Sequence, residues 1–337
     1  MILIDAIYVN YGGALGLLKY LVETLVERKE EFFLLADARC KSEFDQLPHV
    51  EYQDASEKGR KLFYKSHGGK FSAILCFGNV PPTFRLNVPV YTYFHNINML
   101  TLQDCRDWKQ KMKFWLKRTY VKSLRRNTDE WLVQTSNTAK ELTKHLGVSK
   151  EKVKLFPFYK LPAYPQSDKP RTDYIFVGEY SGSKGHMELL EAWKLLHGKG
   201  LDMTLHLTVS LGDEFLKKLD NAIKDGVKII NHGFIQVEEL ADLYMQCKAT
   251  VYPSYNESFG LGLVEAMEAG CDVIASDRPF VHAICEPTET FDPTNPISIA
   301  EAVVRYEKGD KHHTRQIVRD MIGDLIDCIK KRKLNGN

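Results

Sequence analysis

The chain has 337 residues, of which 44% are hydrophobic and 27% charged, and its formal net charge is +2. This composition is typical of a globular protein with a sizeable core, and the length fits two domains of roughly 100–200 residues each better than one. No apolar run approaches the roughly 20 residues that span a bilayer, so we do not expect a membrane-spanning protein. The N-terminus shows no signal peptide, so we do not expect a secreted one.

The first half of the chain alternates strand and helix patterns. Apolar runs predict strands at 2–9, 32–36, 73–77, 88–94, 131–134 and 153–156. Helical patterns between them predict helices at 14–28, 56–66, 104–125 and 137–146. Such alternation predicts a parallel sheet covered by helices on both faces.

A proline-rich segment separates the two halves. Residues 156–171 hold four prolines and little periodicity, and we interpret 161–171 as an interdomain linker. The alternation then restarts, with strands predicted at 174–177, 205–209, 227–230, 249–252 and 273–276. Helices are predicted at 184–196, 214–224, 237–246, 261–269, 297–306 and about 314–331, the last with an apolar stripe at Val318, Ile322, Leu325 and Ile329.

These patterns predict an α/β protein with two doubly wound, Rossmann-like domains that face each other across a cleft. We expect an N-terminal domain at 1–160 and a C-terminal domain at 172–310. Residues 311–337 are expected to form a helix that packs back on the first domain. Because ligands bind at the carboxyl ends of strands in such sheets, the cleft is the expected site.

The two halves differ in charge. Residues 1–160 carry 26 Lys and Arg against 17 Asp and Glu, a net +9, so the remaining 177 residues carry a net −7. Opposite signs favour domains with different partners, the basic one facing an anionic surface or acceptor. Chance drift in surface charge is an equally good explanation.

The segment from Tyr255 to Glu265 is the most informative motif. A short apolar strand precedes it, a Phe-Gly-Leu-Gly turn lies within it, and a helix that ends at Gly270 follows. The start of a helix after a glycine turn offers free N–H groups and the positive end of the helix dipole, which suit a pyrophosphate. Glu257 and Glu265, with seven residues between them, can accept hydrogen bonds from sugar hydroxyls. The arrangement predicts a sugar-nucleotide site.

The run from Val251 to Asp277, VYPSYNESFGLGLVEAMEAGCDVIASD, resembles the E-x7-E signature of retaining glycosyltransferases of family 4, which have the GT-B fold. The resemblance implies that Glu265 binds the ribose and that Glu257 orients the donor sugar. It also implies diphosphate binding at the helix tip, through the segment Ser258, Phe259, Gly260, Leu261 and Gly262.

Two further loops of the second half match the family pattern. After the strand that ends near Gly178, Lys184 stands where the family has a lysine that contacts the donor pyrophosphate; a solvated surface lysine is the alternative. Many members have an arginine soon after the first glycine, and this chain has Glu179 there. Gly233 and Phe234 match a loop beside the nucleotide base, although a plain connecting loop is as good an interpretation.

The first domain contributes two candidates. Gly12 and Gly13 follow the first strand, where the family often has a glycine loop against the donor phosphates or the acceptor. The pair is not a G-x-G-x-x-G fingerprint, so a nicotinamide site is not supported. His95 ends a strand in the sequence Tyr-Phe-His-Asn and is expected near the donor sugar, where a neutral imidazole can bind a hydroxyl or assist the leaving group.

Residues 106–126 predict a basic helix with an aromatic stripe. Trp108, Met112 and Trp115 share one face, and lysines and arginines flank it. This pattern suits peripheral contact with an anionic membrane, and a core-packed helix with a solvated face is the alternative. No nucleic-acid motif accompanies it, so we expect no nucleic-acid partner.

We therefore expect a retaining glycosyltransferase in which the domain at 172–310 binds a UDP- or GDP-linked sugar and the domain at 1–160 binds a carbohydrate acceptor. The chain is also similar to enzymes that assemble bacterial surface polysaccharide, and this similarity implies a lipid-linked acceptor. Catalytic roles are expected for Glu257, Lys184 and His95, with no cofactor and no metal. A GT-B epimerase or phosphorylase and a non-catalytic nucleotide-sugar-binding subunit are the alternatives. The seven cysteines form no C-x-x-C pair, which favours a reducing compartment. We expect a cytoplasmic protein, peripheral on the cytoplasmic face of a membrane.

Overall fold

The structure is a computed structural model that describes residues 1–102, 108–162, 164, 170–309 and 312–331. The described chain forms two compact units. Within the described residues, unit 1 comprises 1–102, 108–160 and 319–331, and unit 2 comprises the residues between 161 and 318. The described chain therefore passes from unit 1 into unit 2 after residue 160 and returns to unit 1 at residue 319.

Unit 1 contains, within the described residues, a seven-stranded parallel sheet in the order β3-β2-β1-β4-β5-β6-β7. Its strands are β1 (Ile2–Ala6), β2 (Phe32–Asp37), β3 (Val50–Gln53), β4 (Ala73–Cys76), β5 (Val90–Phe94), β6 (Glu130–Val133) and β7 (Val153–Leu155). The interior strand β1, ILIDA, is buried along its whole length because helices cover both faces of the sheet. The order reverses beside β1, so the loops after β1 and β4 flank the switch point where ligands bind in such sheets.

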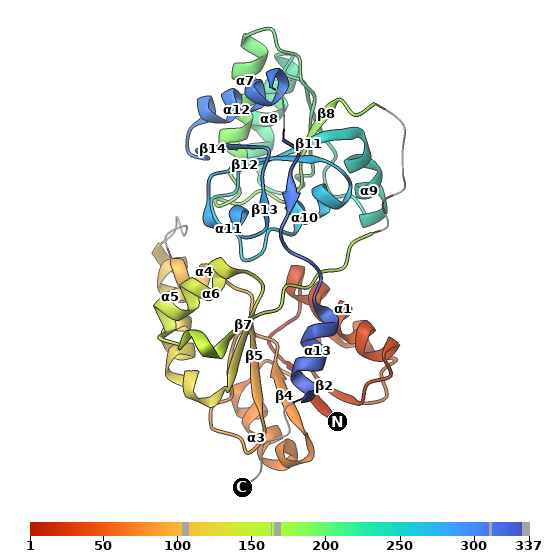
Figure 1. Cartoon of the computed structure of the whole chain (residues 1–337), viewed down its shortest axis with the longest axis vertical. Helices are drawn as coiled ribbons and strands as arrows, with labels where there is room; N and C mark the ends of the chain where they lie inside the picture. Colours follow the sequence, from red (N-terminus) through yellow and green to blue (C-terminus); the bar gives the residue numbers. More distant parts are fainter. Residues whose placement is uncertain (103–107, 163, 165–169, 310–311, 332–337) are drawn as a thin grey trace. The chain divides into compact units, whose positions relative to one another are not determined.

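The helices of unit 1 lie on both faces of this sheet (Figure 1). They are α1 (Gly12–Glu27), α2 (Lys41–Phe44), α3 (Glu57–His67), α4 (Asn98–Thr101), α5 (Trp108–Leu124), α6 (Ser136–Leu146) and α13 (Ile322–Lys331). Helix α13 packs against α1 and β4, and Leu325, Ile326 and Ile329 join the buried cluster that also holds Leu21 and Phe158. This apolar face anchors the end of the chain in unit 1.

Unit 2 contains, in its described part, a six-stranded parallel sheet in the order β10-β9-β8-β11-β12-β14. Its strands are β8 (Asp173–Phe176), β9 (Leu205–Leu207), β10 (Ile229–Asn231), β11 (Cys247–Tyr252), β12 (Asp272–Ser276) and β14 (Glu289–Phe291). The switch point lies between β8 and β11. The helices are α7 (His186–Gly198), α8 (Asp213–Lys224), α9 (Val237–Gln246), α10 (Leu261–Glu268), α11 (Pro279–His282) and α12 (Pro296–Lys308).

The end of the chain differs from the prediction of one helix over 314–331 and of a returning segment that starts at 311. Residues 315–316 form β15 (Arg315–Gln316), which pairs antiparallel with β13 (Cys285–Glu286) in unit 2, and α13 begins only at Ile322. The amide of Ile317 donates to the carbonyl of Ile284 at 2.8 Å. The predicted stripe was wrong at Val318, because these tertiary backbone bonds replace the helical ones there.

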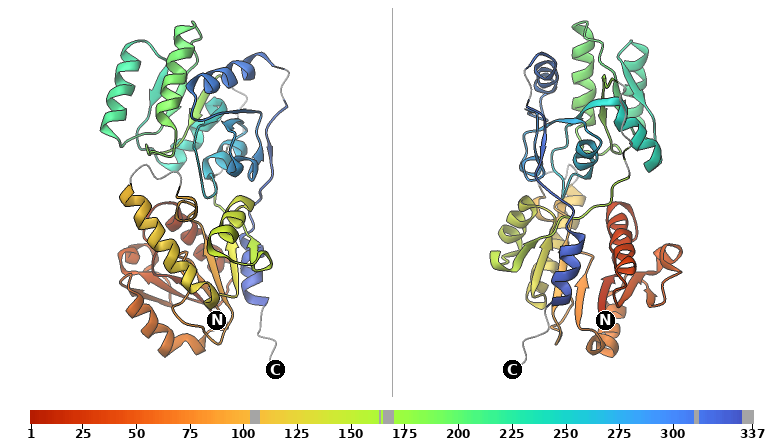
Figure 2. Two further views of the ribbon diagram at one scale, coloured as in Figure 1. Left: turned by 90° about the vertical axis from the view of Figure 1, so that its left-hand side faces the viewer. Right: turned by 45° about the vertical axis from the view of Figure 1, so that its right-hand side comes forward.

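Two sheet strands were missed, β3 and β14, which are short and lie at sheet edges. The predicted helix 104–125 begins among residues outside the described ones, and α5 is observed from Trp108. None of the described helices has the length and apolar character needed to cross a membrane. Helix α5 is the long yellow helix in the left view of Figure 2.

Candidate functional site

Two loops of unit 2 meet at the carboxyl edge of its sheet, beside the β8–β11 switch point. One follows β8 and ends at Gly185, and the other follows β11 and ends at Gly260. The Tyr255 amide donates to the Ser183 carbonyl at 2.8 Å, which ties the loops together. Gly185 lies so close to the second loop that a Cβ there would be 2.4 Å from the Pro253 carbonyl oxygen. The close approach requires glycine, and the Gly185 φ of +69° favours it as well.

Lys184 and Glu257 form an ion pair across these loops. The Lys184 Nζ is 2.7 Å from Glu257 Oε1, and their side chains are 25% and 19% exposed. The ammonium also lies over the Tyr252 ring, 5.7 Å from its centroid, and the Tyr252 hydroxyl donates to Glu257 Oε1 at 3.4 Å. Burial alone lowers the pKa of Lys184, but Tyr252 and Glu257 more than offset it, so the pKa is raised. Lys184 is therefore a fixed cation.

Lys184 lies beside the positive end of the dipole of α7. A cation at such a position is unfavourable unless an anion lies nearby. In the structure Glu257 supplies that anion. Gly178 lies beside the pair, since a Cβ there would be 3.6 Å from Lys184 Nζ. The structure thus brings three sequence-predicted residues, Gly178, Lys184 and Glu257, to one point.

Helix α10 begins next to this pair. Gly260 caps it with a φ of +86°, and the Leu263 amide donates back to the Gly260 carbonyl at 3.0 Å. That amide is therefore already bonded, and Leu261 and Gly262 are the first-turn amides left for an anion. A Cβ at Gly262 would lie 3.1 Å from a Tyr252 ring carbon, so glycine lets the helix pack closely on that ring.

Glu265 lies one turn into α10. The Tyr244 hydroxyl donates to its Oε2 at 3.2 Å. Burial raises the pKa of Glu265, and the Tyr244 hydrogen bond and the charge on Lys184 partly oppose that rise. Ser258 and Phe259, from the same motif, connect Glu257 to the cap, with Phe259 buried and Ser258 half-buried. Both glutamates of the motif thus reach the start of α10.

Glu179 stands where the resemblance implies an arginine. Its carboxylate accepts from the amides of Ser210 and Leu211 at 3.0 and 3.2 Å and from the Ser210 hydroxyl. Burial by itself raises the pKa of Glu179, and these hydrogen bonds outweigh burial and lower it. Glu179 is therefore an ionised tie between two loops.

Gly233 and Phe234 lie in the loop after the edge strand β10. One strand, β9, lies between β10 and β8, so this loop is two strand spacings, roughly 10 Å, from the Lys184 loop along the sheet edge. Phe234 is 73% exposed. Sequence reasoning missed a nearby row of hydrogen-bonded side chains. His206 Nδ1 is 2.9 Å from His232 Nε2, and His206 Nε2 is 3.1 Å from Asp173 Oδ2. No motif signals it, because the three residues come from three different strands or their ends.

Gly12, Gly13 and His95 lie in unit 1, where they line a cavity of about 620 Å³. The His95 amide donates to Asn79 Oδ1 at 2.7 Å, which fixes the Asn79 amide so that its Nδ2 faces His95 Nε2 at 3.3 Å. His95 Nε2 is therefore an acceptor, and the proton resides on Nδ1. Burial lowers the pKa of His95 to about 4, so the ring is neutral. Its Nδ1 has no hydrogen-bond partner among the described residues.

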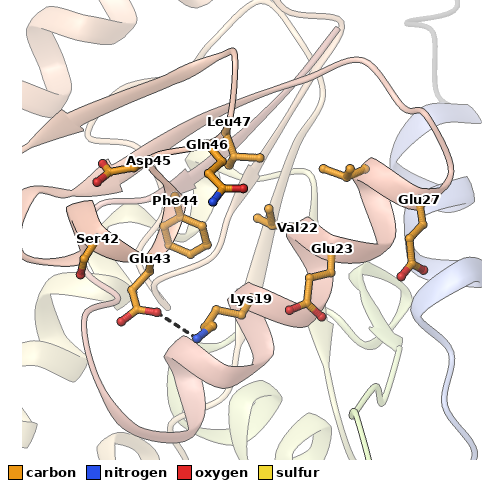
Figure 3. A pocket seen from close by; sticks show the side chains of 11 residues that line it. Lys19, Val22, Glu23, Glu27, Ser42, Glu43, Phe44, Asp45, Gln46 and Leu47 are labelled. Carbon is orange, nitrogen blue, oxygen red and sulfur yellow. Dashed lines mark hydrogen bonds and ion pairs between the residues drawn. The ribbon is translucent and has the colours of Figure 1, made fainter.

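A second cavity of unit 1, of about 450 Å³, lies between α1 and α2 (Figure 3). Val22 and Phe44 form its apolar wall, and Lys19 Nζ is 2.9 Å from Glu43 Oε2 at its mouth. The remaining charged residues of its lining, Glu23, Glu27 and Asp45, are acidic. The negative lining makes it unsuited to a diphosphate.

Comparison with known proteins agrees with the geometry of unit 2. Residues 160–319 match the family described as glycosyl transferases group 1. Unit 2 is a group 1 glycosyltransferase domain. A relative is the serotype-specific mannosyltransferase WbdA of Escherichia coli, 33% identical over 134 residues, which are 39% of this chain and 16% of that protein. The match thus spans about a sixth of that relative's length.

Solved structures show the fold of both units. A sucrose-phosphate synthase from Thermosynechococcus elongatus has a TM-score of 0.73 at 18% identity, covering 91% of this chain and 89% of that one. Anabaena HepE in complex with UDP-glucose has a TM-score of 0.68 at 16% identity, covering 91% and 90%. The group 1 domain and unit 1 together have the GT-B fold, two Rossmann-like domains. The matched range contains Gly178, Lys184, Gly233 and the whole Glu257–Glu265 motif.

Proposed function

We propose that the protein is a retaining glycosyltransferase that moves a sugar from a nucleotide sugar to a carbohydrate acceptor in polysaccharide synthesis. One observation carries the proposal. Lys184 and Glu257 meet from two different loops at the switch point of a group 1 domain, next to the start of α10. A cation, two free amides and two carboxylates at one point suit a diphosphate that is flanked by two sugars.

In the proposed reaction the bond between the anomeric carbon and the diphosphate breaks, and a bond from that carbon to the acceptor hydroxyl forms on the same face. The hydroxyl proton passes to the departing diphosphate. Lys184 and the amides of Leu261 and Gly262 stabilise the charge that develops on the leaving group. Glu265 binds the ribose hydroxyls, Glu257 orients the donor sugar, and the Nδ1–H of His95 donates to a hydroxyl of that sugar. The Gly12–Gly13 loop allows close approach of the ligand in unit 1, and Gly233 and Phe234 contact the base.

The test has two stages. A thermal-shift series with UDP, GDP, ADP and their sugars identifies the base, because a ligand of the native state raises the unfolding midpoint. The donor is then incubated with free and polyprenyl-linked oligosaccharides, and the product linkage is determined by NMR. We expect a uracil or guanine nucleotide to stabilise the chain and the product to keep the donor's anomeric configuration. EDTA should leave the rate unchanged, since Lys184 supplies the fixed charge. An inverted linkage, an epimer or a free sugar phosphate would contradict the proposal.

We propose further that the acceptor is lipid-linked and that α5 holds the protein on the cytoplasmic face of an anionic membrane. Trp108, Met112, Trp115 and Leu116 are 66%, 50%, 47% and 56% exposed, between lysines of the same helix. Exposed aromatic side chains beside basic ones favour an interfacial helix over a core-packed one. The described cysteines are free, five of them buried, in keeping with a reducing compartment.

Vesicle sedimentation checks this part. At low salt the protein should sediment with vesicles that contain phosphatidylglycerol and remain in solution with phosphatidylcholine alone. Replacing Trp108 and Trp115 by Ser should reduce the bound fraction at least about threefold, because the buried apolar area is lost. Leu62→Ser, at an exposed leucine on α3, is the control. Equal sedimentation of the double variant and the wild type would refute the role of α5.

A further inference from the structure

The cavity of unit 1 is built at the carboxyl ends of β1, β4 and β5. Loops after these strands, the start of α3 and one face of α5 line it. Its volume of about 620 Å³ is within the range of small-molecule sites. Its lining mixes two kinds of charged group, a carboxylate from α3 and a cation from α5. The chemistry of these two groups indicates what the cavity accepts.

The carboxylate belongs to a buried charge network. Arg60 and Asp5 are each 1% exposed, and Arg60 Nε is 2.6 Å from Asp5 Oδ2. Arg60 Nη1 is 3.4 Å from Glu57 Oε1, one turn back on α3. The Tyr64 hydroxyl also donates to Asp5. Two carboxylates therefore share one guanidinium, and the network keeps one net negative charge.

Of the two carboxylates, Glu57 lines the cavity and Asp5 does not. Asp5 is buried in the core, whereas the Glu57 side chain is 32% exposed. The Tyr8 hydroxyl donates to its Oε1. Its Oε2 is buried and makes no hydrogen bond of good geometry within the described residues, although the Tyr120 hydroxyl lies beside the carboxylate. A buried carboxylate oxygen with so little compensation is costly, so an added O–H donor from a ligand is favoured.

The cation is Lys117 on α5. No ion pair of Lys117 occurs within the described residues, whereas Arg39, the other cation of the lining, is bonded to Asp37. Burial, followed by the charge on Lys113, lowers the pKa of Lys117. Tyr120, one turn further along α5, also lines the cavity. Burial, followed by the charge on Glu57, raises the pKa of Tyr120, so this ring lies beside Glu57.

Lys117 and Glu57 therefore face one ligand from two sides. Residues three apart on a helix have Cβ atoms roughly 5–6 Å apart, which places Lys117 about one helical turn from the ring that adjoins Glu57. A sugar ring fits such a span, with a hydroxyl at one end and an anionic group at the other. A neutral sugar would leave Lys117 without a counter-ion.

We propose that this cavity binds the acceptor of the transfer as a phosphate-bearing sugar, with one hydroxyl donating to Glu57 Oε2 and the phosphate on Lys117. The inference rests on the proposed function and names the acceptor class. The phosphate belongs either to a lipid diphosphate or to a soluble sugar phosphate, and the same chemistry binds both.

The experiment measures binding by calorimetry, with the stabilising nucleoside diphosphate present at saturation. The probes are methyl α-D-glucoside, α-D-glucose 1-phosphate and a short-chain prenyl diphosphate glucose. We expect both phosphate probes to bind at least about tenfold more tightly than the glucoside, which is about 1.4 kcal/mol. Lys117→Met should abolish that preference, and Glu57→Gln should weaken all three probes about tenfold. A preference for the prenyl probe over the soluble phosphate assigns the phosphate to a lipid, and equal binding assigns it to either source.

Matched variants keep the result interpretable. Lys111→Met lies on the same helix outside the cavity, and Glu43→Gln lies in the other cavity, so neither should change probe binding. Lys117 is exposed, so its variant should fold, and the circular dichroism spectrum and the unfolding midpoint of unit 1 without ligand report folding of the Glu57 variant. Absence of probe binding, or an unchanged phosphate preference in Lys117→Met, would overturn the inference while the nucleotide shift stands. Absence of any nucleotide shift would instead refute the proposed function.

Discussion

Replacing Lys184 by Ala should lower the turnover number roughly 10²–10³-fold, the usual loss when a preorganised charge that stabilises the leaving group is removed. Lys184 is a half-buried cation that Glu257 positions at 2.7 Å, so its charge is available without reorganisation. Nucleoside diphosphate should also raise the unfolding midpoint less in the variant, because the diphosphate loses its counter-charge. Initial-rate kinetics and thermal shift measure the two effects.

Two further variants separate charge from size. Lys184→Arg keeps the charge and should recover part of the rate. Lys194→Ala removes an exposed lysine from the following helix, where its partner is Glu191, and should change the rate less than twofold. A turnover number within a factor of three of the wild type in Lys184→Ala would show that this cation has no part in the chemistry.

The largest expected loss of stability follows Gly185→Ala. Alanine at a φ of +69° costs about 1–2 kcal/mol. Its Cβ would lie 2.4 Å from the Pro253 carbonyl oxygen, a backbone atom that can move only with the second loop, and such overpacking adds about 1–3 kcal/mol. Urea unfolding should therefore show a loss of about 2–5 kcal/mol from the unfolding free energy of unit 2. Since the clash separates the two loops, the Lys184–Glu257 pair should also be disturbed and nucleotide binding weakened.

Gly198→Ala is the matched control, at the other end of α7. A Cβ there meets nothing within 4 Å and its φ is not positive, so alanine should leave stability unchanged or raise it. Equal unfolding midpoints for the two variants would contradict the close approach of the loops. Normal nucleotide binding in Gly185→Ala would show that the loop contact does not position Lys184.

Local patterns were sufficient for much of the fold. The alternation of apolar runs and helical periods predicted both parallel sheets, and the structure confirms most of their strands. Edge strands β3 and β14 were missed, since four and three residues give little periodicity. The end of the chain was predicted wrongly, because the pairing of β15 with β13 is a tertiary contact that overrides a helical pattern.

Part of the candidate site was likewise predicted from local sequence, and part depends on tertiary contacts. The glycine turn, the acidic pair of Glu257 and Glu265 and the helix start are contiguous, so spacing alone located them. The Lys184–Glu257 pair joins two loops that become neighbours only because β8 and β11 pair side by side. Glu57 gave no signal, since Asp5, which shares its partner Arg60, comes near it only in the folded unit.

The sequence by itself determined the period of each element and the local chemistry of the turn before α10, because both depend on residues a few positions apart. The tertiary structure decided which charges face each other. Strand order brings distant loops to one edge of a sheet, and burial decides which of their ions keep a partner. The pairing of Lys184 with Glu257 and the placement of Glu57 and Lys117 in one cavity are consequences of that order, and they carry the predictions made for this protein.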